Sequence, residues 1–102
     1  MKTLKKSIIG ILEDNKGENI ALMDVKGKSS VTDLMFIVSG RSTRHVKSIA
    51  DNLITKLKKN KMKPIGVEGY SSSEWILVDY GDFLVHVMHP ETRDFYSLEK
   101  LW

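Results

Sequence analysis

The sequence feature that most constrains the fold is the apolar run Leu-Met-Phe-Ile-Val, which follows Asp33 and completes a segment at residues 33–38. A strand without polar alternation is typical of a position that is buried on both faces of a sheet. Ser42 then offers a helix N-cap, and apolar residues recur at helical spacing from Val46 to Leu57. The sequence therefore predicts a buried strand that leads directly into a long amphipathic helix.

The remaining segments indicate how this pair is completed. Helical spacing predicts a first helix over residues 3–14, and the long helix is expected to end at Asn60. Extended patterns predict strands at residues 20–25, 64–67, 75–80 and 83–88, with a short helical turn within residues 91–102. The order α-β-β-α-β-β-β-(α) predicts an α/β fold with a mixed sheet of about five strands flanked by helices. Because the 102 residues contain no linker-like stretch, we expect one domain, residues 1–102.

Composition and spacing disfavour several kinds of chemistry. The chain has no cysteine, which excludes disulfides, cysteine-ligated zinc and a cysteine nucleophile. Its first apolar stretch is interrupted by lysines and ends at Glu13. We therefore expect a cytoplasmic location and neither a signal peptide nor a membrane span. His86 and His89 are three apart on an extended segment and would point to opposite faces. We therefore expect no metal, no cofactor and no enzymatic activity.

The charges of the chain are distributed unevenly. Residues 41–63 hold eight lysines and arginines against the single acid Asp51. Residues 64–102 hold seven acids against Arg93 and Lys100, although the net charge of the whole chain is only +3. One segment is thus a candidate for contact with phosphate and the other for contact with a basic partner, unless both are ordinary solvated surfaces.

The start of the long helix is the first candidate site. Backbone N–H groups at a helix N-terminus attract anions, and Arg41, Arg44 and His45 would add positive charge there. The segment contains no phosphate-binding loop motif, since a single glycine, Gly40, precedes the helix. The segment is a candidate for an anion or RNA contact, and the alternative, which the single glycine favours, is a capped helix whose arginines lie in solvent.

The second candidate site is the hairpin formed by residues 75–80 and 83–88, which a tight turn connects. Strand alternation places Trp75, Leu77 and Asp79 on one face and Ile76, Val78 and Tyr80 on the other. A tryptophan beside carboxylates is typical of a protein interface with a basic partner. The alternative is that Trp75 is a core residue and that the aspartates form turns.

Five segments in series are distinctive: residues 24–30, 39–46, 66–69, 75–82 and 85–88. Together with the closing residues 96–102, they resemble the ribosomal silencing factor (Iojap-related) family. The resemblance covers nearly the whole chain in the right order. It implies a fold similar to that of nucleotidyltransferases. Those enzymes use a Gly-Ser turn that is followed by a strand with an Asp-x-Asp pair. Here the two residues of the turn are in the opposite order, Ser39-Gly40, and no Asp-x-Asp follows, so the catalytic residues are missing.

The resemblance also implies a function. Such proteins bind the large ribosomal subunit through its ribosomal protein fourteen, block joining of the small subunit and repress translation when nutrients are limiting. Combined with the charge pattern, it makes Glu68, Trp75, Asp79, Asp82 and His86 the expected partner-binding residues. Two alternatives remain, an RNA-binding ribosome-assembly protein that uses the basic helix and a degenerate nucleotidyltransferase-like protein. Contact with ribosomal RNA and homodimer formation are both left open.

Overall fold

A single five-stranded sheet organises the computed structural model, which describes residues 2–28 and 32–101. Its strands run in the spatial order β1-β2-β5-β4-β3. β2 and β5 are parallel, and the other neighbouring strands are antiparallel. The strands are β1 (Glu18–Asp24), β2 (Leu34–Ser39), β3 (Gly66–Glu68), β4 (Trp75–Asp79) and β5 (Phe83–Met88). The predicted mixed sheet and the β4–β5 hairpin are therefore confirmed.

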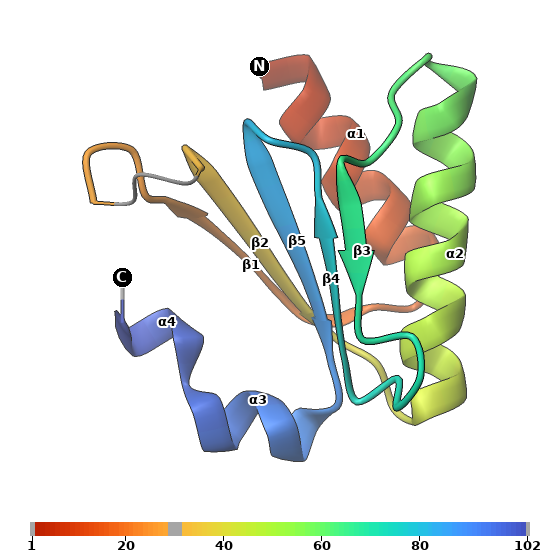
Figure 1. Ribbon diagram of the computed structural model, residues 1–102, viewed down its shortest axis with the longest axis vertical. Coiled ribbons are helices and arrows are strands. Elements are labelled where there is room, and N and C mark those ends of the chain that lie inside the picture. The colour runs from red at the N-terminus through yellow and green to blue at the C-terminus, as the bar shows by residue number, and fades with distance from the viewer. Residues whose placement is uncertain (1, 29–31, 102) are drawn as a thin grey trace.

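One face of the sheet is closed by α1 (Lys2–Asp14) and α2 (Thr43–Lys59), which lie side by side in Figure 1. The apolar stripe of α2 packs on β4 and β5, and α1 adds Ile8 and Leu12 to the same core. Phe36 and Phe83 meet edge to face in this core, with ring centroids 5.9 Å apart. Each fully buried side chain of this size contributes about 1.5–3 kcal/mol, so this face carries most of the apolar stabilisation.

The opposite face is covered only in part, by α3 (Pro90–Tyr96) and α4 (Leu98–Leu101) (Figure 1). Leu98 is buried there in a smaller core with side chains of β2, β5 and the segment after β1, namely Val25, Met35, Ile37, Leu84 and Met88. Over β4 the cover ends, because Trp75 and Leu77 are only half-buried. The sheet thus has one closed face and one half-open face.

The C-terminal region differs from the sequence prediction. A short helical turn was expected within residues 91–102; α4 corresponds to it, and a second helix, α3, precedes it. The His89 side chain accepts a hydrogen bond from the Glu91 N–H, and Pro90 occupies the first helical turn. Proline is favoured at that position because its missing N–H has no helical partner in any case. The helical turn was therefore predicted correctly and only α3 was missed, because a proline that ends a strand can also begin a helix.

Two edge strands also have shifted boundaries. β1 begins at Glu18 rather than residue 20, and β3 is confined to Gly66–Glu68 instead of 64–67. Both strands lie at edges of the sheet, where side-chain burial determines strand ends least. Part of the family-like segment 24–30 lies outside the described residues, as does Trp102 at the end of the closing segment.

Candidate functional site

The half-open face of the sheet gathers most of the residues expected to bind a partner. We call the surface formed by Glu68, Trp75, Leu77 and Asp79 the open sheet face. β3 pairs with β4 so that Glu68 lies opposite Leu77 and Gly66 lies opposite Asp79. Two adjoining depressions, of about 380 and about 100 Å³, are lined by these residues with Gly66 and Gly69. The geometry is that of a shallow surface bordered by two carboxylates.

Trp75 is the largest side chain of the open sheet face, and its position is fixed by two neighbours. Its indole Nε1–H donates to Nδ1 of His86 at 3.0 Å. Its ring also packs against the ring of Tyr96, with centroids 4.8 Å apart. Because the indole N–H already has an acceptor, Trp75 offers a partner its apolar ring rather than a free donor.

His86 lies beneath this surface rather than on it. It is 5% exposed and stands opposite Leu77 in the β4–β5 ladder. Burial lowers the pKa of His86 to about 4, so its imidazole is neutral at pH 7. Since Nδ1 accepts from Trp75, we assign the proton to Nε2, and among the described residues this buried atom has no hydrogen-bond partner. His86 is therefore placed to orient Trp75.

The two aspartates of the hairpin have different environments. Asp79 is half-buried, and one of its carboxylate oxygens accepts from the Gly81 N–H at 2.7 Å. Asp82 is exposed in the turn between β4 and β5, and its carbonyl accepts from the backbone N–H groups of Asp33 and Leu34. Asp79 thus both shapes the turn and borders the open sheet face, whereas Asp82 lies at the end of the hairpin.

Helix α3 adds two aromatic residues that the sequence reasoning did not include. Tyr96 is 50% exposed and Phe95 is 81% exposed, and their rings meet edge to face with centroids 5.1 Å apart. Together with Trp75 they form one aromatic group at the border of the open sheet face. The signal that points to them is Pro90, because a helix start at that proline places the neighbouring aromatics on a helix over the sheet.

The residues proposed for anion binding at the start of α2 have mostly internal partners. The His45 ring accepts from the Arg41 N–H at 2.9 Å, and its other nitrogen lies 2.8 Å from the carbonyl oxygen of Asn15. The His45 N–H donates to the Ser42 hydroxyl, and the Arg41 side chain lies 3.6 Å from Glu18. Arg44 is exposed. The His45 ring and N–H are thus engaged within this segment and by Asn15, and the Arg41 side chain is paired with Glu18.

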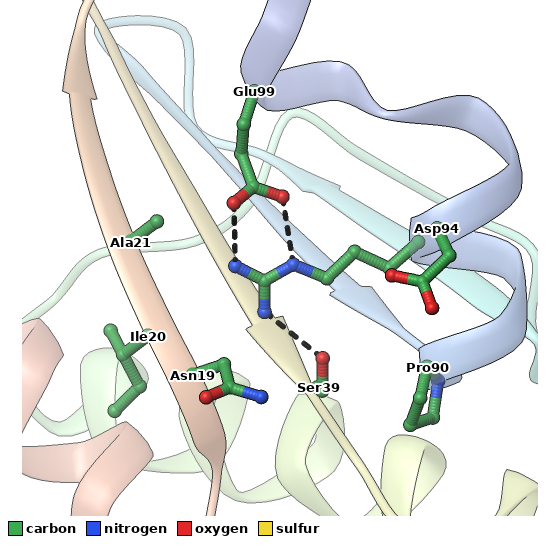
Figure 2. Close-up of a pocket in the computed structure, with 8 residues that line it drawn as sticks. Asn19, Ile20, Ala21, Ser39, Pro90, Asp94 and Glu99 are labelled. Atoms are coloured by element: carbon green, nitrogen blue, oxygen red, sulfur yellow. Dashed lines mark hydrogen bonds and ion pairs between the residues drawn. The ribbon is translucent and has the colours of Figure 1, made fainter.

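A third polar feature is a pocket of about 520 Å³ between β1, the end of β2 and the C-terminal helices (Figure 2). The Arg93 side chain, 9% exposed, lies at its centre. Its guanidinium donates twice to Glu99, at 2.9 and 3.1 Å, and once to the Ser39 hydroxyl at 2.9 Å. These bonds hold the pKa of Glu99 below its ordinary value. The group ties α3 and α4 to the sheet and so keeps Tyr96 beside Trp75.

Two further observations concern the described residues, 2–28 and 32–101. They contain no group of three or more His, Cys, Asp or Glu side chains that could hold a metal ion. None of their helices has the length and apolar character required to cross a bilayer.

The fold and this site define a small α/β protein whose sheet is closed on one face and presents an acidic, aromatic surface on the other. Residues 1–102 match the family model described as "Ribosomal silencing factor during starvation". The ribosomal silencing factor RsfS of Haemophilus influenzae is 46% identical over 99 residues, which are 97% of each chain. The chain belongs to the ribosomal silencing factor family.

Two further relatives extend this comparison. A crystal structure of a Chromobacterium violaceum protein matches with a TM-score of 0.95 and 41% identity, covering 100% of this chain and 85% of that one. The mouse protein named "Mitochondrial assembly of ribosomal large subunit protein 1" is 34% identical over 98 residues, which cover 93% of this chain and 43% of that one. The predicted family and the predicted fold class are therefore both confirmed.

Proposed function

We propose that this protein docks on the large ribosomal subunit through the open sheet face and there contacts ribosomal protein fourteen. Its bulk then blocks joining of the small subunit, which represses translation when nutrients are limiting. The observation that carries the proposal is the fixed aromatic group of Trp75 and Tyr96 beside the carboxylates of Glu68 and Asp79. Membership of the ribosomal silencing factor family supports it.

The chemistry of this surface favours a basic protein as the partner. Aromatic residues at the centre of an interface contribute most of the binding energy, and carboxylates at its rim steer a positively charged surface into place. Trp75 is held by His86 and Tyr96 before binding, so little side-chain entropy remains to be lost. Residues 64–102, which contain the whole surface, have seven acids and two basic residues.

The proposed mode of action is binding rather than catalysis. The name of the family describes a regulatory role, and this sequence lacks an Asp-x-Asp pair after Ser39-Gly40 for the metal ions of nucleotidyl transfer. We further propose that residues 1–102 act as one ribosomal-silencing-factor domain, without a cofactor, in the cytoplasm where translating ribosomes are found.

Sedimentation with separated ribosomal subunits tests this proposal. The wild-type protein is expected to comigrate with the large subunit and to reduce the joined fraction when small subunits are added. The double variant Trp75→Ala/Asp79→Lys should bind at least about 30-fold more weakly, since the loss of a central aromatic alone typically costs about 2 kcal/mol or more. Glu13→Lys, an exposed charge reversal on α1, is the matched control and should behave as wild type.

A second variant distinguishes a docking defect of the double variant from a defect in its folding. Glu68→Lys alters an exposed side chain of the short edge strand β3 and should weaken binding without loss of helical circular dichroism. Wild-type affinity in both folded variants would contradict docking through the open sheet face.

A role in assembly of the large subunit is a second candidate function. The observation that favours it is the mouse relative, whose printed name refers to assembly of that subunit. Cells that lack this protein would then accumulate large-subunit precursors during growth in rich medium. A normal precursor profile together with excess subunit joining under starvation would favour silencing instead.

A further inference from the structure

The outward face of α2 is a positively charged surface that lies apart from the open sheet face. The inward face of the helix is apolar and buried on the sheet. Its outward face carries four exposed cations, Arg44, Lys47, Lys58 and Lys59. Between them lie only small polar residues and one acid, which are Ser48, Asp51, Asn52 and Thr55. The helix contributes no aromatic or aliphatic side chain to this outward face.

Helix stability does not account for this arrangement. Cations stabilise the C-terminal end of a helix, so Lys58 and Lys59 in the last turn are favourable there. Arg44 lies in the first turn, where a positive charge opposes the helix dipole, and that turn contains no acid. The cations therefore lie at both ends of the outward face, including the end at which they cost stability.

The positive charge is also poorly compensated. Residues 41–63 contain eight lysines and arginines, and of these only Arg41 has an ion pair within residues 2–28 and 32–101. Asp51, the single acid of the segment, accepts a hydrogen bond of 2.5 Å from the Tyr70 hydroxyl. In the part of the chain that the structure describes, Arg44, Lys47, Lys58 and Lys59 thus have no ion pair with a carboxylate of a neighbouring element.

Position in the fold keeps this surface accessible during docking. α2 lies on the closed face of the sheet, on the other side from α3 and α4 (Figure 1). A partner bound to the open sheet face therefore leaves the outward face of α2 uncovered and available to a second ligand.

We infer that the outward face of α2 binds an RNA backbone without regard to base sequence. Arg44, Lys47, Lys58 and Lys59 would neutralise phosphates, and the short hydroxyl and amide side chains between them leave room for the strand and can donate to it. A membrane surface is disfavoured because the apolar face of α2 is already buried in the core. An acidic protein is disfavoured because this face has no aromatic or apolar anchor.

The inference goes beyond docking through the open sheet face and stands apart from it, because the two surfaces share no residue. Fluorescence anisotropy with a labelled single-stranded RNA, at salt concentrations from about 50 to about 200 mM, tests it. The test variant is Lys47→Gln/Lys58→Gln/Lys59→Gln. The control is Lys16→Gln/Lys26→Gln/Lys100→Gln, which removes an equal number of positive charges from exposed positions outside α2.

Each single-strand phosphate contact contributes about 0.7 to the slope of log affinity against log salt. We expect the slope to fall by about 2 in the α2 variant and to stay at the wild-type value in the control. Binding of both variants to isolated ribosomal protein fourteen should be unchanged, which keeps this inference separate from the proposed docking. Equal loss of slope in both variants, or no RNA binding by wild type at about 50 mM salt, would overturn the inference.

Discussion

The two faces of strand β4 have different surroundings although their residues alternate along one short segment. Ile76 and Val78 are 0% exposed on the face covered by α2, whereas Trp75 and Leu77 on the other face are half-buried. The closed face is filled by aliphatic and phenylalanine side chains, and the open sheet face by an aromatic group between two carboxylates. Under the proposed docking, stability and recognition depend on opposite faces of the same sheet, so substitutions should affect them separately.

The largest effect is expected for a truncation on the closed face. Leu53 of α2 is 0% exposed in the core, and Leu53→Ala should lower the free energy of unfolding by about 2–5 kcal/mol. Leu77→Ala removes the same atoms from the half-open face and should cost clearly less, because water can enter the space that is left. Urea unfolding of the two variants measures the difference. Equal losses would contradict the assignment of stability to the closed face.

The second prediction concerns acid and uses the buried imidazole of His86. Its pKa is lowered from 6.5 to about 4 in the folded protein, so the unfolded chain binds more protons between these values. This contribution to stability is therefore complete above pH 6.5 and is lost as the pH falls towards 4. The loss at about pH 4.5 amounts to about 2–3 kcal/mol.

His86→Gln retains a side-chain acceptor for the Trp75 indole but cannot take up a proton in this range. Urea unfolding at pH 7 and at about pH 4.5 should therefore reveal a smaller acid loss in this variant than in wild type. The same acid loss in both proteins would exclude His86 as its source.

The third prediction tests recognition without stability. Phe95 is 81% exposed on α3, so Phe95→Ser should leave the free energy of unfolding within about 0.5 kcal/mol of wild type. If the aromatic group of Trp75, Tyr96 and Phe95 forms the interface, the same change should weaken binding to the large subunit by more than about 1 kcal/mol. Calorimetric titration and urea unfolding on one preparation compare both quantities. A loss of stability without a loss of binding would reverse the expected pattern.

The fourth prediction, with the smallest expected effect, concerns a change at the start of α2 that should lower stability without weakening binding. The Ser42 hydroxyl accepts from the His45 N–H at 3.1 Å, and Ser42→Ala should lower the free energy of unfolding by about 1 kcal/mol. Because α2 lies on the closed face, binding to the large subunit should not change. Ser42→Asn, which retains a capping oxygen, is expected to restore most of the lost stability.

Much of this architecture could be predicted because local pattern and tertiary burial agree. The apolar run of β2 and the stripe from Val46 to Leu57 on α2 are unambiguous, and the alternation in β4 assigned each residue to its observed face. The α2 boundaries followed from Ser42 and Asn60, which are its caps. These signals depend on residues that are close together in the sequence.

The features that sequence reasoning missed depend on contacts between distant segments. The hydrogen bond from Trp75 to His86 requires the register of the β4–β5 hairpin, and the packing of Tyr96 on Trp75 requires α3 to fold back over the sheet. The tie from Arg93 to Ser39 spans 54 residues and has no local signature. The sequence therefore predicted which face would be acidic and aromatic, but not how its tryptophan is held.

The most direct test of the central claim is site-specific photo-crosslinking from the two sides of the sheet. A photoreactive residue would replace Leu77 on the open sheet face in one sample and Ser48 on the outward face of α2 in another, each mixed with purified large subunits. We predict that the crosslink from position 77 joins ribosomal protein fourteen and that position 48 gives no crosslink to that protein. A crosslink to ribosomal protein fourteen from position 48 and none from position 77 would contradict docking through the open sheet face.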